Sequence, residues 1–521
     1  MRGGFGERSF DAPVFGLTPG PSARRTWHTA TLRGRGEAVQ TDLIQWAVFI
    51  GLTALMAILT AWQVSRMGGR STDSNREYFL AGGNLTWPFI AGSITLTNLS
   101  TDQLVGMNGN QMLLLAWWEL SAIVGLLMLC WIFLPIYYRN NCTTTTELLE
   151  RKYGSKHLRA VVSVLFLLGN VFIYLPIMLY TGSLFLKTMF GVDIPLIAIA
   201  AVMAILGGAY AISGGLRAVA VYDTISGIGI LAMALLVMVL AMAAIDFDFS
   251  GIPPERLSMI GDKDSPIPWQ TLLTGMIFIQ MFYWSTNQTI TQRAMAAPTL
   301  REGQKGVLAA ALIRLLIIPA IVVVPGVAAY KLFGDAGDAT YGRIVATVMP
   351  GWLSGAFAAF MAAALLTSYT SVLNSSVTLY VCDLHEKFIA EKPNVARLNT
   401  IISLAFLVLS VLLVPIYMGA DSIINLVQQL NGLLSMPILS AFIVGLMFRN
   451  VDARAVMGAV VFGTLLYAGF TFVWTPTHYI HLMVVTLGAC VAFALGVNRL
   501  AFGKRAVLVN SLRTRLGLKA L

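Results

Sequence analysis

Charged residues are scarce in this sequence. Asp, Glu, Lys and Arg make up 12% of its 521 residues, whereas hydrophobic residues make up 57%. Ordinary globular chains contain roughly 25% charged and about 45–50% apolar residues. So few charges cannot cover the surface of a soluble protein of this length, and the chain is too hydrophobic to be disordered. The composition therefore predicts a membrane protein and excludes soluble enzymes and disordered chains.

Cysteine and histidine are also rare. The four cysteines, Cys130, Cys142, Cys382 and Cys490, form no CxxC pair. This excludes a disulfide scaffold and disfavours metal or redox roles, so we expect small buried side chains. None of the five histidines lies at the centre of an apolar run, and the sequence contains neither HExxH nor GxxxxGK[ST]. These absences argue against a membrane enzyme and a primary pump.

The net charge of +10 comes from basic residues scattered in short segments between apolar runs. Scattered charge of this kind makes no continuous stripe for phosphates, so we expect no nucleic-acid partner. It orients a protein in the lipid bilayer instead.

The apolar runs predict an all-α polytopic protein. A helix that crosses the hydrocarbon needs about 20 mostly apolar residues, and the sustained alternation of a β-barrel strand is absent. Thirteen runs qualify, at residues 42–65, 85–107, 112–138, 157–188, 194–213, 217–244, 269–290, 304–332, 352–382, 396–418, 422–448, 454–475 and 479–500.

Basic residues in the short loops predict the orientation. When thirteen spans alternate, four basic segments fall on one side, which the positive-inside rule makes cytoplasmic. The longest loop between spans is acidic and falls on the other side. We therefore expect a cytoplasmic C-terminal tail (501–521), an external N-terminus, and a place in the plasma membrane, the inner membrane of a bacterium. The basic residues are Arg139, Arg151, Lys152 and Lys156; Arg293, Arg301 and Lys305; Lys387, Lys392 and Arg397; and Lys504, Arg505, Arg513, Arg515 and Lys519.

Residues 1–40 disagree with this orientation, because they carry six arginines. They contain Pro and Gly and lack the apolar core of a signal peptide. We predict a disordered N-terminal extension; a cleaved targeting arm is the alternative.

Polar residues interrupt the second run. Thr95, Thr97, Asn98 and the stretch 100–103 lie at its middle. A regular helix that faces lipid does not tolerate such a cluster, whereas a broken helix beside a cavity uses it to hold an ion or a substrate. The alternative is an unbroken helix whose hydroxyls bond back to the preceding turn.

The ninth run carries a hydroxyl-rich stripe. Thr367, Ser371, Asn374 and Thr378 fall on one helical face. Such hard oxygen ligands suit a small alkali cation; close packing against another helix is the alternative.

The seventh run combines amides with aromatic rings. Gln280, Trp284, Asn287 and Thr291 share one face, with Tyr283 at its edge. Amides bind the hydroxyls of a sugar or polyol, and a flat ring covers its apolar face. Interfacial anchoring would explain the rings but not the amides.

Isolated charges within runs are candidates for function, and four stand out: Asp102, Glu119, Asp223 and Arg314. Each costs about 3 kcal/mol to insert alone, so each is expected to face a partner or a wet cavity.

Four stretches have a familiar pattern. They are TNLSTDQLVGMNG at 97–109, GGLRAVAVYDT at 214–224, FYWSTNQTITQRAMAA at 282–297 and TSYTSVLNSS at 367–376. They resemble the sodium/solute symporter family, most of all its sodium/glucose cotransporter branch, and the likeness extends over residues 42–500. The resemblance implies a leucine-transporter-type fold of about 13 transmembrane helices. Runs two to six and runs seven to eleven would form two inverted five-helix repeats around a site at the midplane, and 214–224 would be a turn.

The resemblance also implies sodium as the co-transported ion. The common sodium site would use the carbonyls of Leu96, Leu99 and Ala364 with the hydroxyls of Thr367 and Ser368. A second sodium site would use Asp223, Thr370 and Ser371. A carboxylate paired with Arg217 is the structural alternative for Asp223.

For the substrate, the resemblance implies a sugar site with Tyr283 stacked over the ring as an inner gate. Arg314 stands where the family often has Lys, and its planar fork would favour an anionic or carboxylated solute. The other positions that match the sugar site are Asn98, Gln103, Glu119, Gln280, Trp284 and Gln428.

The expected function is thus sodium-coupled import of a sugar, and not catalysis. Three alternatives stay open. The same fold could carry another solute, such as an amino acid, a sialic acid or myo-inositol. A proton could replace sodium, with Asp223 or Glu119 titrating. A sensor or channel could be built on transporter architecture.

Overall fold

The computed structural model describes residues 43–59, 62, 85–390, 394–420 and 422–509, but not the side chains of 96–97 and 213–225. The predicted extension at 1–40 and the tail beyond residue 509 lie outside these ranges.

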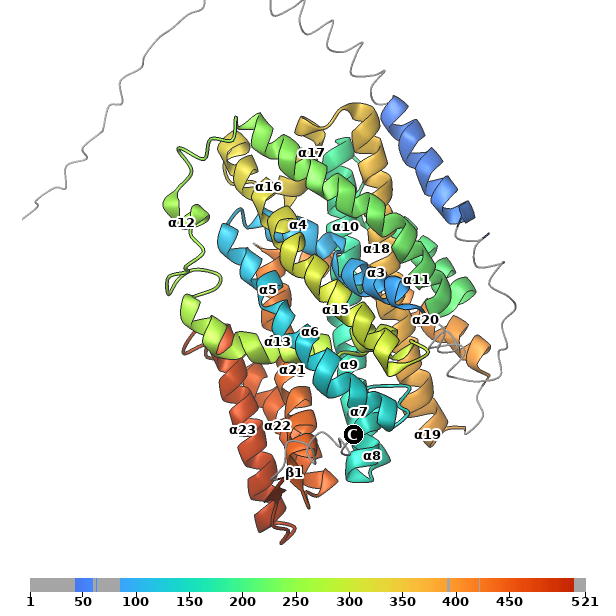
Figure 1. Cartoon of the computed structure of the whole chain (residues 1–521), viewed down its shortest axis with the longest axis vertical. Coiled ribbons are helices and arrows are strands. Elements are labelled where there is room, and N and C mark those ends of the chain that lie inside the picture. The colour runs from blue at the N-terminus through green and yellow to red at the C-terminus, as the bar shows by residue number, and fades with distance from the viewer. Residues whose placement is uncertain (1–42, 60–61, 63–84, 391–393, 421, 510–521) are drawn as a thin grey trace, which may run out of the picture.

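The described chain is almost entirely helical, as the apolar runs predict, because a helix satisfies its own backbone groups in lipid (Figure 1). The first half contains Leu43–Leu59, α3 (Trp87–Asn98), α4 (Thr101–Gly109), η2 (Leu113–Ala116), α5 (Trp117–Leu120), α6 (Ala122–Met128), η3 (Leu129–Phe133), α7 (Leu134–Arg139), α8 (Glu147–Tyr153), α9 (Lys156–Gly169), η4 (Asn170–Tyr174), α10 (Leu175–Phe190), α11 (Leu196–Ala244) and α12 (Pro254–Leu257).

The second half repeats this pattern of long and short helices. It contains η5 (Trp269–Leu273), α13 (Gly275–Ser285), α14 (Gln288–Met295), α15 (Leu300–Leu316), α16 (Ile318–Phe333), η6 (Gly337–Ala339), α17 (Thr340–Val348), α18 (Gly351–Leu379), η7 (Tyr380–His385), α19 (Glu386–Phe388), α20 (Val395–Tyr417), α21 (Ile423–Met447), α22 (Ala453–Phe472) and α23 (Tyr479–Leu500). Two short strands, β1 (Phe448–Arg449) and β2 (Val507–Leu508), pair antiparallel.

Among the described residues, nine helical segments are long and apolar enough to cross a membrane. They account for the predicted runs at 112–138, 157–188 and 217–244 and for the six runs from 304–332 onward. The four cysteines are buried and free, as predicted.

Two of the predicted runs are broken helices. α3 ends at Asn98, where Leu99 (ψ 66°) leaves the helical region, and α4 begins at Thr101. This confirms the break predicted in the second run. α13 ends at Ser285 and α14 begins at Gln288, so the seventh run is broken too, although its sequence was interpreted as one continuous face. Interrupted helices at corresponding positions of two halves are typical of inverted repeats.

The region 194–244 differs from the prediction. In place of two helices joined by a turn at 214–224, the structure has one helix, α11, of 49 residues (Figure 1). A Gly-Gly pair marks 214–215, but glycine permits a helix at a cost of about 1 kcal/mol and no proline interrupts the segment. At 1.5 Å per residue, α11 is roughly 73 Å long, more than twice the hydrocarbon core.

Three π-helical turns shift the register of long helices. η4 ends at Tyr174 and η7 contains Asp383. Turns of this kind occur frequently at functional sites because the extra residue re-aims the side chains that follow. Tyr174 faces the cavity described below, and Asp383 faces a buried arginine.

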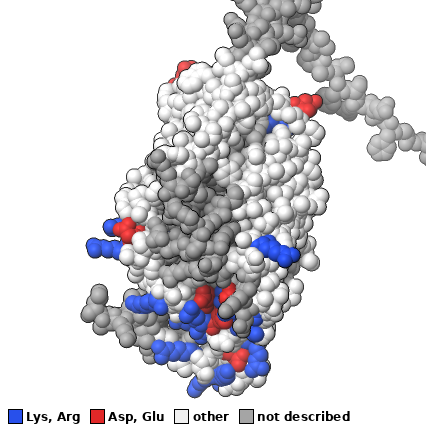
Figure 2. Space-filling model, turned by 90° about the vertical axis from the view of Figure 1, so that its right-hand side faces the viewer, with Lys and Arg blue, Asp and Glu red and all other residues white. Residues whose placement is uncertain are grey.

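That arginine, Arg159 of α9, joins three elements at one end of the molecule. Its Nη2 lies 2.6 Å from Asp383 of η7, and its Nη1 lies 2.6 Å from Glu150 of α8. Asp383 also accepts hydrogen bonds from the hydroxyls of Thr144, Thr146 and Ser163. Figure 2 shows that lysine and arginine side chains gather at this end, which also holds α19 and β1 in Figure 1.

Close packing of α6 against α13 positions the centre of the molecule. A Cβ at Gly125 would meet the Gln280 carbonyl oxygen and lie 2.8 Å from Trp284 Cβ. Ser285 Oγ donates to the Gly125 carbonyl at 2.9 Å. Only glycine allows α6 to approach this closely.

Gly125→Ala should therefore overpack this contact and cost about 1–3 kcal/mol. Thermal unfolding of the purified protein in detergent should show a melting temperature several degrees lower. Gly488→Ala in α23 is the matched control, because a Cβ there meets nothing within 4 Å. Equal melting temperatures for the two variants would contradict the close approach.

Candidate functional site

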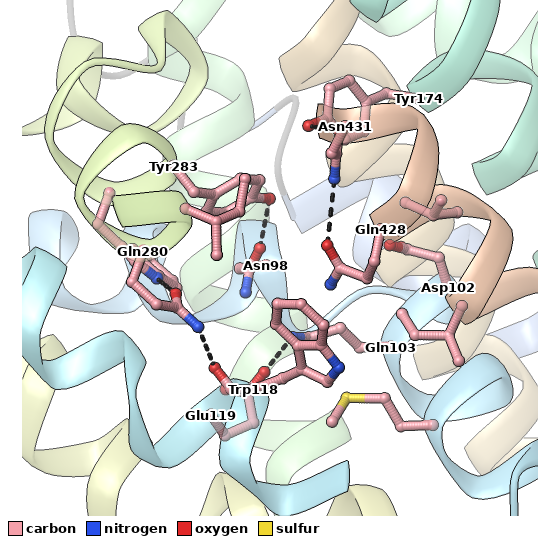
Figure 3. A pocket seen from close by; sticks show the side chains of 15 residues that line it. Asn98, Asp102, Gln103, Trp118, Glu119, Tyr174, Gln280, Tyr283, Gln428 and Asn431 are labelled. Atoms are coloured by element: carbon pink, nitrogen blue, oxygen red, sulfur yellow. Dashed lines mark hydrogen bonds between the residues drawn. The ribbon is translucent and has the colours of Figure 1, made fainter. Parts of the chain in front are cut away.

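A cavity of about 60 Å³ lies where the two broken helices meet (Figure 3). α3, α4, α5, η4, α13 and α21 each contribute side chains to it. The lining residues are Asn98, Asp102, Gln103, Met107, Trp118, Glu119, Tyr174, Ile279, Gln280, Tyr283, Trp284, Ile424, Val427, Gln428 and Asn431.

The structure brings together seven of the eight residues predicted for the substrate. Only Arg314 does not line the cavity; it lies behind Glu119. The lining adds four polar or aromatic residues to the predicted set. Asp102 and Asn431 were visible as polar residues in apolar runs, whereas Trp118 and Tyr174 carry no signal that separates them from ordinary aromatics. The seven predicted residues that line the cavity are Asn98, Gln103, Glu119, Gln280, Tyr283, Trp284 and Gln428.

The break in the seventh run redirects two of its predicted face residues. Asn287 caps α14, and its side chain accepts a hydrogen bond from Thr289 N at 2.9 Å. Thr291 Oγ1 donates to the Asn287 carbonyl at 2.8 Å. Both side chains therefore serve the helix start and not the cavity, because the face was predicted for an unbroken helix.

A buried ion pair forms one wall. Arg314 donates from Nη2 to Glu119 and from Nη1 to the Thr95 carbonyl at 3.2 Å, and its guanidinium lies 4.6 Å from the Trp284 ring. The side chains of Arg314 and Glu119 are 1% and 2% exposed. Gln103 Nε2 donates to the second oxygen of Glu119. Glu119 thus neutralises Arg314, and the arginine also supports the last turn of α3.

Gln280 fixes the neighbouring aromatic wall. Its Nε2 donates to the Trp118 carbonyl at 2.7 Å and to Ser121 Oγ at 2.8 Å. Its Oε1 accepts from Trp284 Nε1 at 2.9 Å. The amide orientation is therefore determined by these partners, and it in turn holds the plane of the buried Trp284 ring.

Two hydrogen bonds close the cavity from different helices. Tyr283 of α13 donates to Asn98 Oδ1 of α3 at 2.6 Å, which joins the two broken helices. Tyr174 donates to Asn431 of α21, whose Nδ2 donates to Gln428 at 3.3 Å. A volume of about 60 Å³ is below the roughly 300–1,000 Å³ of ligand pockets, so binding of a solute requires these contacts to separate.

The predicted common sodium site lies where α3 packs against α18. α3 ends just before Leu99, and the last turn of a helix leaves carbonyls without intrahelical donors. On α18, the hydroxyl of Thr367 points to the Ala364 carbonyl at 3.1 Å, and Ser368 is fully buried beside it. The backbone of Leu96 belongs to α3, while its side chain is outside the described set.

The residues predicted for a second sodium site have other partners. Thr370 Oγ1 donates to the Gly207 carbonyl of α11 at 3.0 Å. Ser371 accepts from Nη2 of Arg293, whose Nε donates to Ser93 of α3 at 2.8 Å. The side chain of Asp223 lies outside the described residues, as does that of Arg217.

The position of Arg293 corrects the sequence analysis, which counted it among the loop charges. It is fully buried in α14 and connects α14 with α3 and α18. Arg293 follows the seventh apolar run directly, so it was assigned to a loop. The chain instead continues past the end of that run as the buried helix α14, which contains Arg293.

The comparison with known proteins now decides the family. The model of the sodium:solute symporter family matches residues 78–463. The chain belongs to this family. It is a sodium-coupled solute transporter and not an enzyme, and sodium is its co-transported ion.

Two relatives and one solved structure show how far the symporter resembles known proteins. The uncharacterized symporter YidK of Escherichia coli (strain K12) is 34% identical over 84% of this chain and 80% of its own length. The sodium/glucose cotransporter of Vibrio parahaemolyticus is 30% identical over 80% and 83%. A Na⁺-coupled sialic acid symporter in a substrate-bound outward-open state has a TM-score of 0.76 at 18% identity, covering 89% of this chain and 99% of that one. This last likeness confirms the leucine-transporter-type fold.

The buried ion pair generates a stability prediction. Arg314→Met should cost about 3–5 kcal/mol, because it leaves Glu119 buried without its partner. The double variant Glu119→Gln/Arg314→Met should recover most of this loss. Thermal unfolding in detergent measures both.

Lys305→Met is the control, since Lys305 pairs with Glu302 at 2.9 Å on an exposed surface and such pairs contribute about 0–1 kcal/mol. A double variant as unstable as Arg314→Met alone would show that the arginine acts through packing and not through its charge.

Proposed function

We propose that this symporter imports a sugar or a related polyol by alternating access. The observation that carries the proposal is one cavity, placed between the two broken helices, whose lining combines amides with aromatic rings. Amides from Asn98, Gln103, Gln428 and Asn431 offer both donors and acceptors, which is what a ring of hydroxyl groups needs. Tyr283, Trp118 and Trp284 supply flat apolar surfaces for the faces of a sugar ring.

Tyr283 is proposed as the inner gate. Its hydroxyl bonds to Asn98 across the two broken helices, so releasing this one contact separates α13 from α3 on that side of the cavity. A hexose that enters would replace the Asn98 contact with hydroxyls of its own and stack against the ring. Closure would then depend on the substrate being present.

The common sodium ion is proposed to bind at Leu96, Leu99, Ala364, Thr367 and Ser368. Support comes from the packing of α18 against the end of α3 and from the Thr367 hydroxyl beside the Ala364 carbonyl. An ion there would tie the broken helix to α18 and hold the cavity in its binding geometry. A second sodium at Asp223, Thr370 and Ser371 is proposed on the resemblance to the family; in this structure Ser371 would have to exchange its bond from Arg293 for the ion.

Import is proposed because the basic end of the molecule fits the cytoplasmic side. Lysine and arginine gather at one end of the molecule (Figure 2), the end that holds α8, α19 and β1 in Figure 1, as the positive-inside rule requires of cytoplasmic segments. Moving one charge through 100 mV releases about 2.3 kcal/mol, and a tenfold sodium gradient adds about 1.4 kcal/mol. One sodium ion can thus support an accumulation of several hundredfold.

The remaining alternatives differ in solute. The hydroxyl and carbonyl oxygens proposed at α18 are suited to the sodium ion that this family co-transports. Sialic acid, amino acids and myo-inositol are competing solutes on the same fold. A sensor or channel would bind or conduct without accumulation.

The decisive experiment is uptake of labelled sugars into proteoliposomes. With an inward sodium gradient, we expect accumulation of at least one neutral hexose or polyol above equilibrium, and none with potassium or proton gradients. A Hill slope above 1 for sodium would support the second ion. Saturable binding without accumulation would contradict transport and favour a sensor.

The sodium site makes a separate prediction. Thr367→Ala removes one proposed hydroxyl ligand and should raise the sodium concentration for half-maximal uptake about tenfold or more, since one charge-assisted oxygen contact contributes about 1.5–3 kcal/mol. Sodium titration of initial uptake rates measures this.

Thr464→Ala in α22 is the matched control, because Thr464 only bonds back to the Val460 carbonyl at 3.0 Å. If Thr367→Ala and Thr464→Ala require the same sodium concentration, the site is not at Thr367.

A further inference from the structure

Asp102 is a second carboxylate of the cavity, and the residues implied by the family resemblance do not include it. It lies in the first turn of α4 and lines the cavity together with Gln103. In Figure 3 its side chain projects from the side of the cavity that also holds Gln428, while Gln280 and Tyr283 lie on the other side. A solute in the cavity therefore contacts an acidic group directly.

The two carboxylates of the cavity differ in their charge balance. Glu119 forms an ion pair with the buried Arg314. Asp102 forms no ion pair with any lysine or arginine of the described residues, and no basic side chain belongs to the cavity lining. One of the two carboxylates therefore has no basic partner among the described residues, and nothing in the cavity lining would compensate its negative charge when it is ionised.

The start of α4 is occupied by this same carboxylate. Asp102 accepts hydrogen bonds from Ser100 Oγ and from backbone amides of its own turn. The positive end of a half-helix in such transporters otherwise points at an anionic group of the substrate. Here the chain's own aspartate takes the place that a substrate carboxylate would need.

We infer that Asp102 is a specificity-determining residue that excludes anionic solutes and selects neutral polyols. Its free oxygen lone pairs accept hydroxyl donors of a sugar. A carboxylated solute would bring a second negative charge into the same cavity without a basic partner, because Arg314 is already neutralised by Glu119. This inference rests on the proposed function. It opposes the earlier expectation that Arg314, which stands where the family often has Lys, favours an anionic solute.

The expected discrimination is large enough to measure. Two like charges about 5 Å apart at an effective dielectric constant of 20 repel strongly enough to change an affinity on the order of a hundredfold. Replacing the carboxylate by an amide removes the repulsion while the size of the side chain is kept.

The test compares neutral sugars with the acids that differ from them at one carbon. Sodium-driven uptake into proteoliposomes is measured for labelled D-glucose and D-galactose, and for D-glucuronate and D-galacturonate. For the natural chain we expect the neutral sugar to be preferred on the order of a hundredfold. In Asp102→Asn this preference should fall at least about tenfold, whereas Asp102→Glu should keep it.

Asp248→Asn is the matched control, because Asp248 is an exposed residue paired with Lys331 at 2.8 Å. This variant should prefer neutral sugars over the acids as strongly as the natural chain does. If Asp102→Asn does not reach the membrane, Asp102→Ser replaces it. If a variant does not transport, binding of the same four compounds is titrated in the presence of sodium by the change in tryptophan fluorescence, to which Trp118 and Trp284 of the cavity contribute. The titrations give the ratio of the affinities for the neutral sugars and for the acids.

The outcomes separate this inference from the proposed function. An unchanged preference in Asp102→Asn, or a natural chain that prefers the acids, overturns the role of Asp102 and leaves sodium-driven transport of sugar-like solutes in place. Uptake of none of the four compounds overturns the proposed substrate class and this inference with it.

Discussion

The structure depends on one constraint: in the hydrocarbon, every backbone group that leaves a helix must find a partner in the protein. At both breaks, side chains add hydrogen bonds to the backbone. Arg314 donates to the Thr95 carbonyl at the end of α3, and Tyr137 of α7 donates to the Ser285 carbonyl at the end of α13. Asn287 caps the start of α14. Arg314 and Tyr137 lie on α15 and α7, which do not line the cavity, so the broken helices that form the site are supported by helices behind it.

The same constraint governs the charges. Arg314 is balanced by Glu119 in the centre, and Arg159 is balanced by Asp383 and Glu150 at the basic end. Two of these pairs, Glu119–Arg314 and Arg159–Asp383, join elements from the two halves of the chain, because Glu119 and Arg159 precede α11 whereas Arg314 and Asp383 follow it. Breaking such a pair would leave a buried charge, so the two halves are held together at two separate levels. Movement of one half against the other must preserve or replace these partners. The basic end is the easier one to rearrange, because Glu150 is partly exposed and also contacts Lys387 at 3.2 Å.

Much of the fold follows from composition and local pattern. Apolar runs predict helices because hydrophobic length is a local property, and the polar cluster at 95–103 predicts the first break because no lipid-facing helix would carry it. The second break is not visible in the same way. Thr286 and Asn287 fit equally well on a polar helical face, and only the backbone shows that Asn287 is extended. The continuous α11 was missed because a Gly-Gly pair is compatible with a turn and with a helix, and local sequence does not choose between them.

The residues of the cavity were predictable as types, but their partners were not. Gln280 and Arg314 both suggest substrate ligands by their chemistry, yet the structure commits Gln280 to Trp118, Ser121 and Trp284, and Arg314 to Glu119 and the α3 backbone. Apart from the bond between Gln280 and Trp284, these contacts join residues more than 150 positions apart, which no local pattern encodes. These existing contacts also affect how a solute can bind. A solute that enters a cavity of about 60 Å³ must exchange hydrogen bonds with side chains that are already satisfied. Under the proposed function, recognition is the difference between bonds broken and bonds formed. We expect Asn98 and Gln428, which each have one such partner, to contribute more to it than Gln280 and Arg314, which have several.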